Sequence, residues 1–375
     1  MGKRASICRL NFSILRTMPS SVFAKNIRWF FMRFFSERYI RLWFEKKSGG
    51  EPEIFQYKAD ISTCQKIVIF LPPEQGKFFV LLPFALSLST NRMPDNFLVI
   101  TEEDNRPILR ALDLERASLF YNDKTMLYGT SDFFEIEKRI QERRWDLCLF
   151  LQENATLPFL YLARTTGAPY RMGVKQDFPF LNITLKNASY SDDIYANRNF
   201  LYKTFLIDSQ KAEKDSIHAT LKNEKLNSTS KLSTANTILL NLEPPINGEP
   251  WAESEVFAIC KAFQPGWRLI TIAATTAQMD LYSKVMEQLD MRSNHVLLHS
   301  ESVFSVLRQY PGIITLNSIH SHLFLNLSNI KVLMIEQELE QGYIMPNNQR
   351  MMKFSRTGNF YSLSKLASDF LRESK

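Results

Sequence analysis

The stretch WDLCLFLQENATLPFLYLARTTGAPYRMGV, residues 145–174, carries the pattern that decides the fold. Its apolar run LCLFL at 147–151 is continuous rather than alternating, which is typical of a parallel strand buried on both faces. The segment before it, 133–144, has the length of a helix and contains the charged sequence IEKRIQERR. Helical segments that alternate with such strands predict a doubly wound α/β sheet.

Similar apolar runs lie on both sides of this stretch. They are IVIFL at 67–71 and FLVI at 97–100 upstream and, beyond a polar segment at 209–236, TILLNL at 237–242, RLITIAA at 268–274, GIITL at 312–316 and KVLMIE at 331–336. Amphipathic helices are expected between the later runs, for example at 253–263 and 276–289. Two α/β halves joined by a polar linker place a cleft between the carboxyl ends of their strands, where ligands bind.

The pattern divides the chain into five parts. We expect a basic aromatic arm at 1–50, an N-terminal Rossmann-like domain at 60–208, a polar linker at 209–236, a C-terminal Rossmann-like domain at 237–345, and a tail with a closing helix at 346–375.

The charge of the chain is concentrated in the arm. The 375 residues carry a net charge of +7, but residues 1–47 hold eleven Lys/Arg and two acids, so the arm carries +9 and the remainder −2. Nucleic-acid binding requires a basic face on a folded domain, so we expect no nucleic-acid partner. As a helix, residues 25–47 have a broad apolar arc with Trp and Phe and an imperfect basic face with Arg opposite it. This combination suits an anionic membrane surface. A helix packed on the protein's own core and a cleaved targeting peptide are the alternatives.

Composition excludes several classes of protein. No apolar run reaches 18 residues, so a conventional transmembrane helix is not expected. There is no GxxxxGK[ST] and no GxGxxG motif. The four cysteines are scattered without a CxxC, which argues against a disulfide framework or a zinc site and favours a reducing, cytoplasmic compartment. His320 and His322 have the spacing of a possible metal site, but no carboxylate or cysteine lies beside them in the sequence, so no metal is expected.

The opening stretch resembles glycosyltransferase family 9, the ADP-heptose:lipopolysaccharide heptosyltransferases. Trp145-Asp146 and Gln152 match the family's "YDLVIDLQ" strand, and Gly167, Arg171 and Gly173 match its "GA-x-x-R-x-G".

Three further stretches extend the resemblance to residues 65–336. Gly76 and Pro83 fall at their expected positions after the first strand, and Trp251 looks like the family's "K-x-W-P". The sequence TLNSIHSHLFLNLSNIKVLMI is similar to "DTGLSHLAAALGVPVVALF", with Ser318, Ser321 and His322 in matching places. The resemblance implies a GT-B fold, in which two Rossmann-like domains face a nucleotide-sugar cleft.

The resemblance also implies an activity in lipopolysaccharide biosynthesis. It is the transfer of a sugar from a nucleotide-sugar donor, with ADP-heptose as one candidate, to a lipid-linked or cell-envelope glycan acceptor, without a metal or a separate cofactor. The substrate-binding residues carried over by it are Gly76, Gln152, Arg171, Trp251, Asn317, Ser318 and His322.

The sequence departs from the family where chemistry is expected. Lys77 stands in place of the catalytic Asp, and a charged lysine is a poor base. Lys77 either pairs with Glu74 or contacts a phosphate, and Glu74 is the alternative base. Glu249 replaces the phosphate-binding Lys, and a carboxylate there repels a diphosphate. The Asp-Thr-Gly turn is replaced by residues 317–319, Asn-Ser-Ile, and the loss of its Gly removes a close backbone approach to phosphate.

These departures leave alternatives open. His322 either hydrogen-bonds the loop at the start of its helix or keeps a ligand contact, and the plain interpretation of Trp251 is structural. The chain is either a divergent glycosyltransferase at the cytoplasmic membrane face or a catalytically inactive GT-B-like protein that acts in membrane-associated binding or scaffolding.

Overall fold

The computed structural model describes residue 61 and residues 63–90, 92–122, 126–153, 155–174, 180–185, 193–212, 214–215, 237–246, 248–263, 267–273, 275–290, 295–297, 310–328, 330–336, 350–356 and 358–372. The predicted N-terminal arm lies outside the described residues, and so does most of the predicted linker 209–236. Within the described part of the chain, no helix has the length and apolarity that a membrane span requires.

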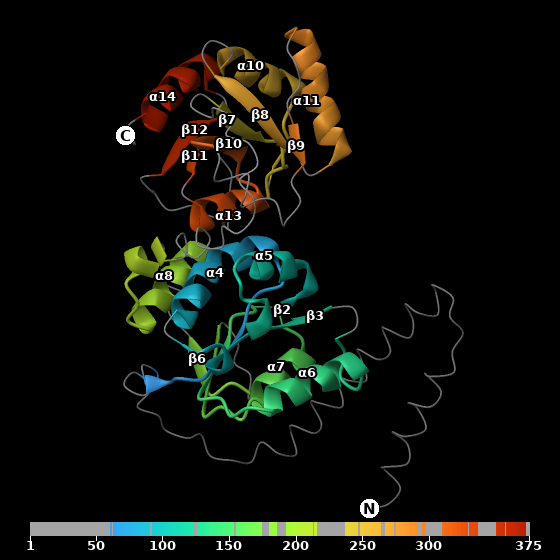
Figure 1. Cartoon of the computed structure of the whole chain (residues 1–375), viewed down its shortest axis with the longest axis vertical. Helices are drawn as coiled ribbons and strands as arrows, with labels where there is room; N and C mark the ends of the chain where they lie inside the picture. The colour runs from blue at the N-terminus through green and yellow to red at the C-terminus, as the bar shows by residue number, and fades with distance from the viewer. Residues whose placement is uncertain are drawn as a thin grey trace, which may run out of the picture. The chain divides into compact units, whose positions relative to one another are not determined.

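Two six-stranded sheets organise the chain (Figure 1). The first has the order β3-β2-β1-β4-β5-β6, and its strands are β1 (Ile67–Phe70), β2 (Phe97–Glu102), β3 (Ser118–Tyr121), β4 (Leu147–Phe150), β5 (Tyr170–Val174) and β6 (Ile183–Leu185). The second has the order β12-β11-β10-β7-β8-β9, and its strands are β7 (Thr237–Asn241), β8 (Arg268–Ala273), β9 (His295–Leu297), β10 (Gly312–Leu316), β11 (Lys331–Glu336) and β12 (Met351–Ser355).

Helices connect the strands. They are α4 (Gln75–Ser89), α5 (Arg106–Ala111), α6 (Ser131–Gln141), α7 (Leu157–Thr165), α8 (Ile194–Thr204), α10 (Glu253–Phe263), α11 (Thr276–Gln288), α13 (Ile319–Leu327) and α14 (Phe360–Arg372). Short 3-10 turns at Pro94–Asn96, Glu103–Asn105 and Glu115–Ala117 complete the connections in the first half. On the second sheet, α10 packs beside both α11 and α14.

The fold class predicted from the sequence is confirmed. Numbered within its own sheet, each set of six strands has the order 3-2-1-4-5-6 of a Rossmann-like fold. The continuous apolar runs form the central strands: every residue of β1, β4, β7 and β10 is buried. In such an order, successive strands are added toward one edge of the sheet and then toward the other. This reversal of strand order lies between the parallel neighbours β1 and β4 in one sheet and between β7 and β10 in the other.

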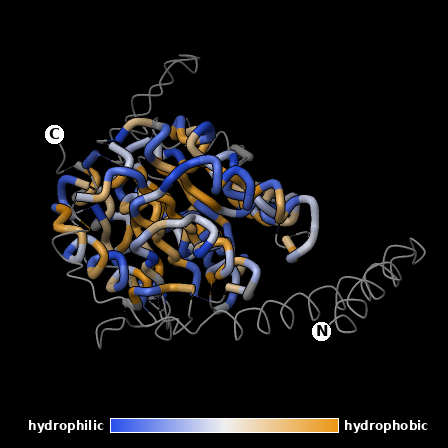
Figure 2. Tube along the Cα trace, turned by 90° about the horizontal axis from the view of Figure 1, so that it is seen from below, coloured by the Kyte–Doolittle hydropathy of each residue, from blue (hydrophilic) through white to orange (hydrophobic). Residues whose placement is uncertain are grey.

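Contacts divide the chain into two compact units. The first unit comprises Met1–Phe70, Leu98–Glu103 and Leu119–Leu185, and the second comprises Leu71–Phe97, Asp104–Ser118 and Lys186–Lys375. Each unit has its own hydrophobic core. Along the trace in Figure 2, hydrophobic stretches alternate with hydrophilic ones, as amphipathic helices and buried strands require. The predicted domain limits, which assign 60–208 to one domain, stay a prediction.

The residues that carry the family resemblance in the first unit hold strands together. The Asp146 carboxylate accepts hydrogen bonds from the amides of Gln65 and Lys66 at 3.0 and 2.9 Å, which fixes the start of β1 against β4. The buried Trp145 indole donates to the carbonyl of Ile140 at 2.8 Å and so ties α6 to the same strand.

Two glycines of this stretch have separate structural reasons. Gly167 follows α7 with a φ of +64°, a conformation that favours glycine because a Cβ strains it. Gly173 lies in β5, where a Cβ would stand 2.1 Å from Cδ1 of the buried Leu181. The first glycine is therefore required by the backbone, and the second by packing.

Gly173→Val should lower the free energy of unfolding by roughly 1–3 kcal/mol, the usual cost of overpacking a core. Urea-induced unfolding measures this loss. The side chain of Leu181 is what a larger residue at position 173 would contact. Gly173→Val should therefore lower the free energy of unfolding less in a Leu181→Ala background than in the wild type. Equal costs in the two backgrounds would contradict the packing explanation.

Candidate functional site

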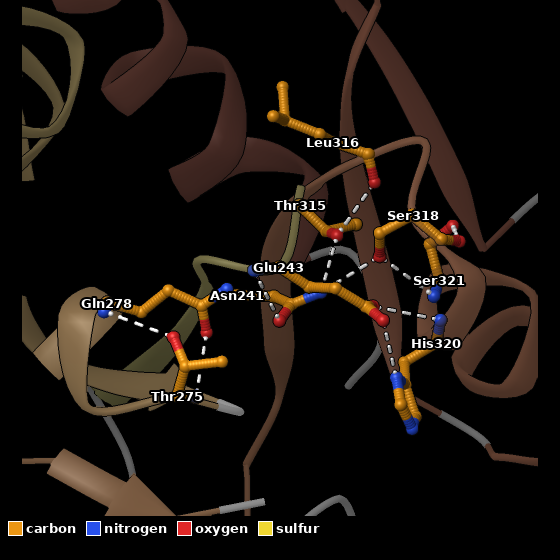
Figure 3. Close-up of polar contacts among 9 residues, drawn as sticks. All are labelled: Asn241, Glu243, Thr275, Gln278, Thr315, Leu316, Ser318, His320 and Ser321. Atoms are coloured by element: carbon orange, nitrogen blue, oxygen red, sulfur yellow. Dashed lines mark hydrogen bonds and ion pairs between the residues drawn. The ribbon is translucent and has the colours of Figure 1, made fainter. Parts of the chain in front are cut away.

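A polar cluster occupies the carboxyl ends of β7 and β10, the two strands between which the second sheet reverses direction. Asn241 is the last residue of β7, and its Nδ2 donates to Thr315 Oγ1 at 3.0 Å and to Ser318 Oγ at 3.1 Å (Figure 3). Its Oδ1 accepts the backbone amide of Glu243 at 3.2 Å. One buried amide side chain therefore fixes β7, the end of β10 and the residue that follows β7.

Glu243 binds His320 through both carboxylate oxygens (Figure 3). Oε2 accepts the His320 backbone amide at 3.0 Å, and Oε1 lies 2.8 Å from the ring nitrogen Nδ1. The two side chains are only 12% and 18% exposed. This pairing holds the imidazole in one orientation, because the same carboxylate is hydrogen-bonded to the backbone amide and to the ring of His320.

The environment keeps Glu243 ionised. Burial alone would raise its pKa, but hydrogen bonds from the His320 ring and amide and from the Ser318 hydroxyl, with the charge of His320, outweigh it and lower the pKa. An ionised carboxylate only accepts hydrogen bonds, so the proton between Oε1 and Nδ1 belongs to the ring. In its neutral form the His320 imidazole consequently carries its proton on Nδ1 and a lone pair on Nε2.

The start of α13 is closed by the protein's own acceptors. Ser318 is the N-cap, and its Oγ accepts the Ser321 amide at 3.3 Å, while Glu243 takes the His320 amide. The positive end of a helix dipole favours a carboxylate there. A phosphate at this helix end would compete with Glu243 for the same amide.

His322 lies on the same helix but faces a buried network. It has no exposed surface, and its Nδ1 lies 2.8 Å from the Tyr195 hydroxyl of α8. Asn326 Nδ2 donates to the same hydroxyl at 3.1 Å. The Tyr195 hydroxyl therefore joins His322 to Asn326, three residues from two helices. The sequence suggested a hydrogen bond from His322 to the preceding loop, but its Nδ1 is bonded to α8 instead.

A buried cation completes this network. The guanidinium of Arg198 donates to Asn326 Oδ1 at 2.5 Å and lies 5.1 Å from the centre of the Tyr195 ring. Burial, assisted by the charge of Arg198 and opposed by Glu243, lowers the pKa of His322 to about 3. His322 is thus neutral across the physiological pH range.

The proposed residues of α4 belong to the second unit. Glu74 is the exposed N-cap position of α4, Gly76 is buried in its first turn, and Lys77 follows it. One turn further on, the Phe79 ring centre lies 5.9 Å from that of His320. The start of α4, where the family resemblance places a catalytic residue, therefore approaches the start of α13.

The other predicted residues have structural contacts. The buried Trp251 donates from Nε1 to the Asn241 carbonyl at 2.8 Å. The carbonyl of Asn317 accepts the Ile246 amide at 2.9 Å and so holds the loop after β7. Glu249 is exposed, and its carbonyl accepts from Arg356 at 2.7 Å.

Two predicted residues lie in the first unit. The buried Gln152 donates from Nε2 to the Tyr121 hydroxyl at 2.9 Å. Arg171 donates to the carbonyls of Phe180 and Ala168 at 2.8 and 2.6 Å, which links β5 to the segments on either side of it.

Sequence reasoning missed Glu243 and misjudged His320. The sequence shows no carboxylate beside His320, but in the structure Glu243 binds it from 77 positions away. A usable signal exists: Glu243 comes two residues after the end of a buried strand at the reversal point, where ligand-binding polar residues gather. Within the described part of the chain, no three His, Cys, Asp or Glu side chains gather in a way that could hold a metal.

The geometry defines a two-sheet α/β protein with a polar cluster at a reversal point of strand order. No protein-family model matches the sequence, and no curated protein matches it. Solved structures do match. A glycosyltransferase of family 9 from Veillonella parvula DSM 2008 has a TM-score of 0.61 and 12% identity, over 83% of this chain and 98% of that one.

Two Escherichia coli enzymes give similar values. Heptosyltransferase WaaC with ADP has a TM-score of 0.60 and 13% identity, and ADP-heptose lipopolysaccharide heptosyltransferase II has 0.55 and 13%; each comparison covers 83% of this chain and 100% of the other. At such identities the likeness shows the fold alone. The chain has the GT-B fold of family 9 glycosyltransferases, and the fold implied by the sequence resemblance is confirmed.

Acidification should destabilise the protein through His322. Its folded pKa of about 3 lies below the unfolded value of about 6.5, so its contribution is complete above pH 6.5 and is lost as the pH falls toward 3. Between pH 7 and pH 5 the wild type should lose about 2 kcal/mol more of its unfolding free energy than His322→Gln does. Urea unfolding at the two pH values measures the difference. Equal losses would mean that His322 does not titrate in this way.

Proposed function

We propose that the chain is a glycosyltransferase that takes a sugar from a nucleotide-sugar donor. The observation that carries the proposal is the polar cluster of Asn241, Glu243, Ser318 and His320 at the carboxyl edge of the second sheet. Doubly wound sheets bind ligands at this edge, where the strand order reverses. The fold of the chain supports the same proposal, since family 9 structures share it and the WaaC structures contain ADP or ADP-2-deoxy-2-fluoro heptose.

The donor, in this proposal, is a nucleoside diphosphate sugar of the kind found in those structures, and ADP-heptose is the first candidate. We further propose a lipid-linked or cell-envelope glycan as the acceptor, with residues 25–47 bringing the protein to an anionic membrane surface. The eleven basic residues of the arm and its Trp and Phe residues support this part of the proposal.

A second candidate function rests on a specific observation. Glu243 already binds the amide that a phosphate at the start of α13 would need, and Lys77 is no base in its charged form. These two facts favour a GT-B-like protein without catalytic activity, in which the carboxylate replaces the diphosphate and the protein acts in membrane-associated binding or scaffolding.

Ligand binding separates the two functions. A ligand that binds only the native state stabilises it by mass action and so raises the midpoint temperature of unfolding. At a ligand concentration of 100 times the Kd, the free energy of unfolding increases by about 2.7 kcal/mol. The full-length chain with millimolar ADP, UDP, GDP or ADP-heptose should show an upward midpoint shift with one nucleotide class. The expected donor should then yield a transferred sugar and a free nucleoside diphosphate in the presence of an acceptor glycan.

A matched variant controls for changes in charge. Glu253→Gln removes an exposed carboxylate that pairs with Lys284 on the second unit, so it should keep the nucleotide shift. Absence of a shift with every nucleotide in both the wild type and Glu253→Gln would contradict the transferase function for these donors and favour the second candidate.

A further inference from the structure

We propose that His320, oriented by Glu243, is the group that accepts the proton of the acceptor hydroxyl. This inference rests on the proposed function and supplies the base that the sequence lacks at Lys77. It assigns roles to two residues: His320 contacts the reacting hydroxyl, and Glu243 acts through His320 as a positioning residue.

The position of the ring is set from three sides. The carboxylate of Glu243 holds Nδ1 and the backbone amide, as Figure 3 shows. The centre of the Phe79 ring of α4 lies 5.9 Å from that of His320, and the centre of the Phe324 ring of α13 lies 6.4 Å away with an angle of 30° between the ring planes. A ring confined in this way presents its remaining nitrogen in a fixed direction, and Figure 3 shows Nε2 turned away from Glu243. Fixed orientation of a base is the geometric requirement for proton abstraction.

The charge arrangement suits a base. With Glu243 ionised, Nδ1 keeps the ring proton and Nε2 has the lone pair. When Nε2 takes a second proton, the imidazolium stands against the carboxylate at 2.8 Å, which stabilises the charge as it forms. A carboxylate that holds the imidazole in the required tautomer plays the same part in other hydrolytic and transfer sites.

The competing side chains are less suited. His322 Nδ1 is already hydrogen-bonded to the Tyr195 hydroxyl, and the side chain has no exposed surface. Lys77, when charged, has no lone pair. Among the histidines of the second unit whose side chains the structure describes, His320 alone has a partly exposed ring, at 18%.

The proposed step balances in atoms and charge. The acceptor hydroxyl gives its proton to Nε2 of His320, and its oxygen uses an electron pair to form a bond to the anomeric carbon of the donor sugar. The bond from that carbon to the phosphate oxygen breaks, and its electron pair leaves with the nucleoside diphosphate. Afterwards the imidazolium releases the proton to water.

Three variants of the full-length chain test the inference. His320→Gln should lower kcat for sugar transfer roughly 10²–10⁴-fold, the usual value of general base catalysis, while the nucleotide-induced midpoint shift stays. Glu243→Gln should also lower kcat, because an amide side chain no longer requires the ring proton to lie on Nδ1. Glu253→Gln should behave as the wild type.

A spectroscopic measurement separates this role from simple stabilisation of the fold. The chain has five histidines, so their ring nitrogens can be labelled with ¹⁵N and resolved by NMR. The His320 signal, assigned by its loss in His320→Gln, should show the proton on Nδ1 in the wild type. Glu243→Gln should shift protonation toward Nε2, whereas Glu253→Gln should not.

The outcomes distinguish this inference from the proposed function. Sugar transfer at wild-type kcat in His320→Gln, or a wild-type His320 with its proton on Nε2, overturns the role of His320 and leaves the glycosyltransferase function standing. A wild type that binds no nucleotide and transfers no sugar overturns both. A gain of ADP binding in Glu243→Gln over an inert wild type shows instead that Glu243 blocks a phosphate position, and it too overturns the role.

Discussion

The burial of parallel strands on both faces is the constraint on which the rest of this structure depends. A strand that is covered on both sides carries mainly apolar side chains, as β7 and β10 do, and the polar side chains of these two strands lie at or next to their ends. Where strand order reverses, two such ends lie side by side. The cluster of Asn241, Glu243, Ser318 and His320 therefore stands at a place where the fold tolerates buried polar side chains.

Burial also explains how tightly the cluster is bonded. A carboxylate that is 12% exposed is costly unless its oxygens are satisfied, and both oxygens of Glu243 are. Asn241 fixes the backbone before Glu243, and Ser318 fixes the start of α13, so the acid and the histidine meet in one arrangement. The site is rigid because its polar groups satisfy one another, which is a condition for precise chemistry.

The sequence predicts the fold better than the site, and particular residues show why. The run TILLNL predicts β7 because its apolar character is local, and the family resemblance implies the two Rossmann-like sheets that are found. The partnership of Glu243 and His320 joins residues 77 positions apart, so neither local pattern nor spacing contains it. The resemblance pointed to Glu249, which is exposed, whereas Glu243 lies outside the motifs that carry the resemblance.

His320 and His322 lie on the same helix but have different environments. Residues two positions apart on a helix point to opposite sides, so His322 faces α8 and its Tyr195, while His320 faces Glu243 and the ring of Phe79. The Tyr195 hydroxyl is hydrogen-bonded to Nδ1 of His322, whereas Glu243, which only accepts, keeps the proton of His320 on Nδ1. The pKa of the first is lowered by burial beside Arg198, so it stays neutral. The second has an ionised carboxylate at 2.8 Å that can balance a positive charge. Of these two histidines, His320 is the one whose ring is partly exposed and bonded to an ionised carboxylate.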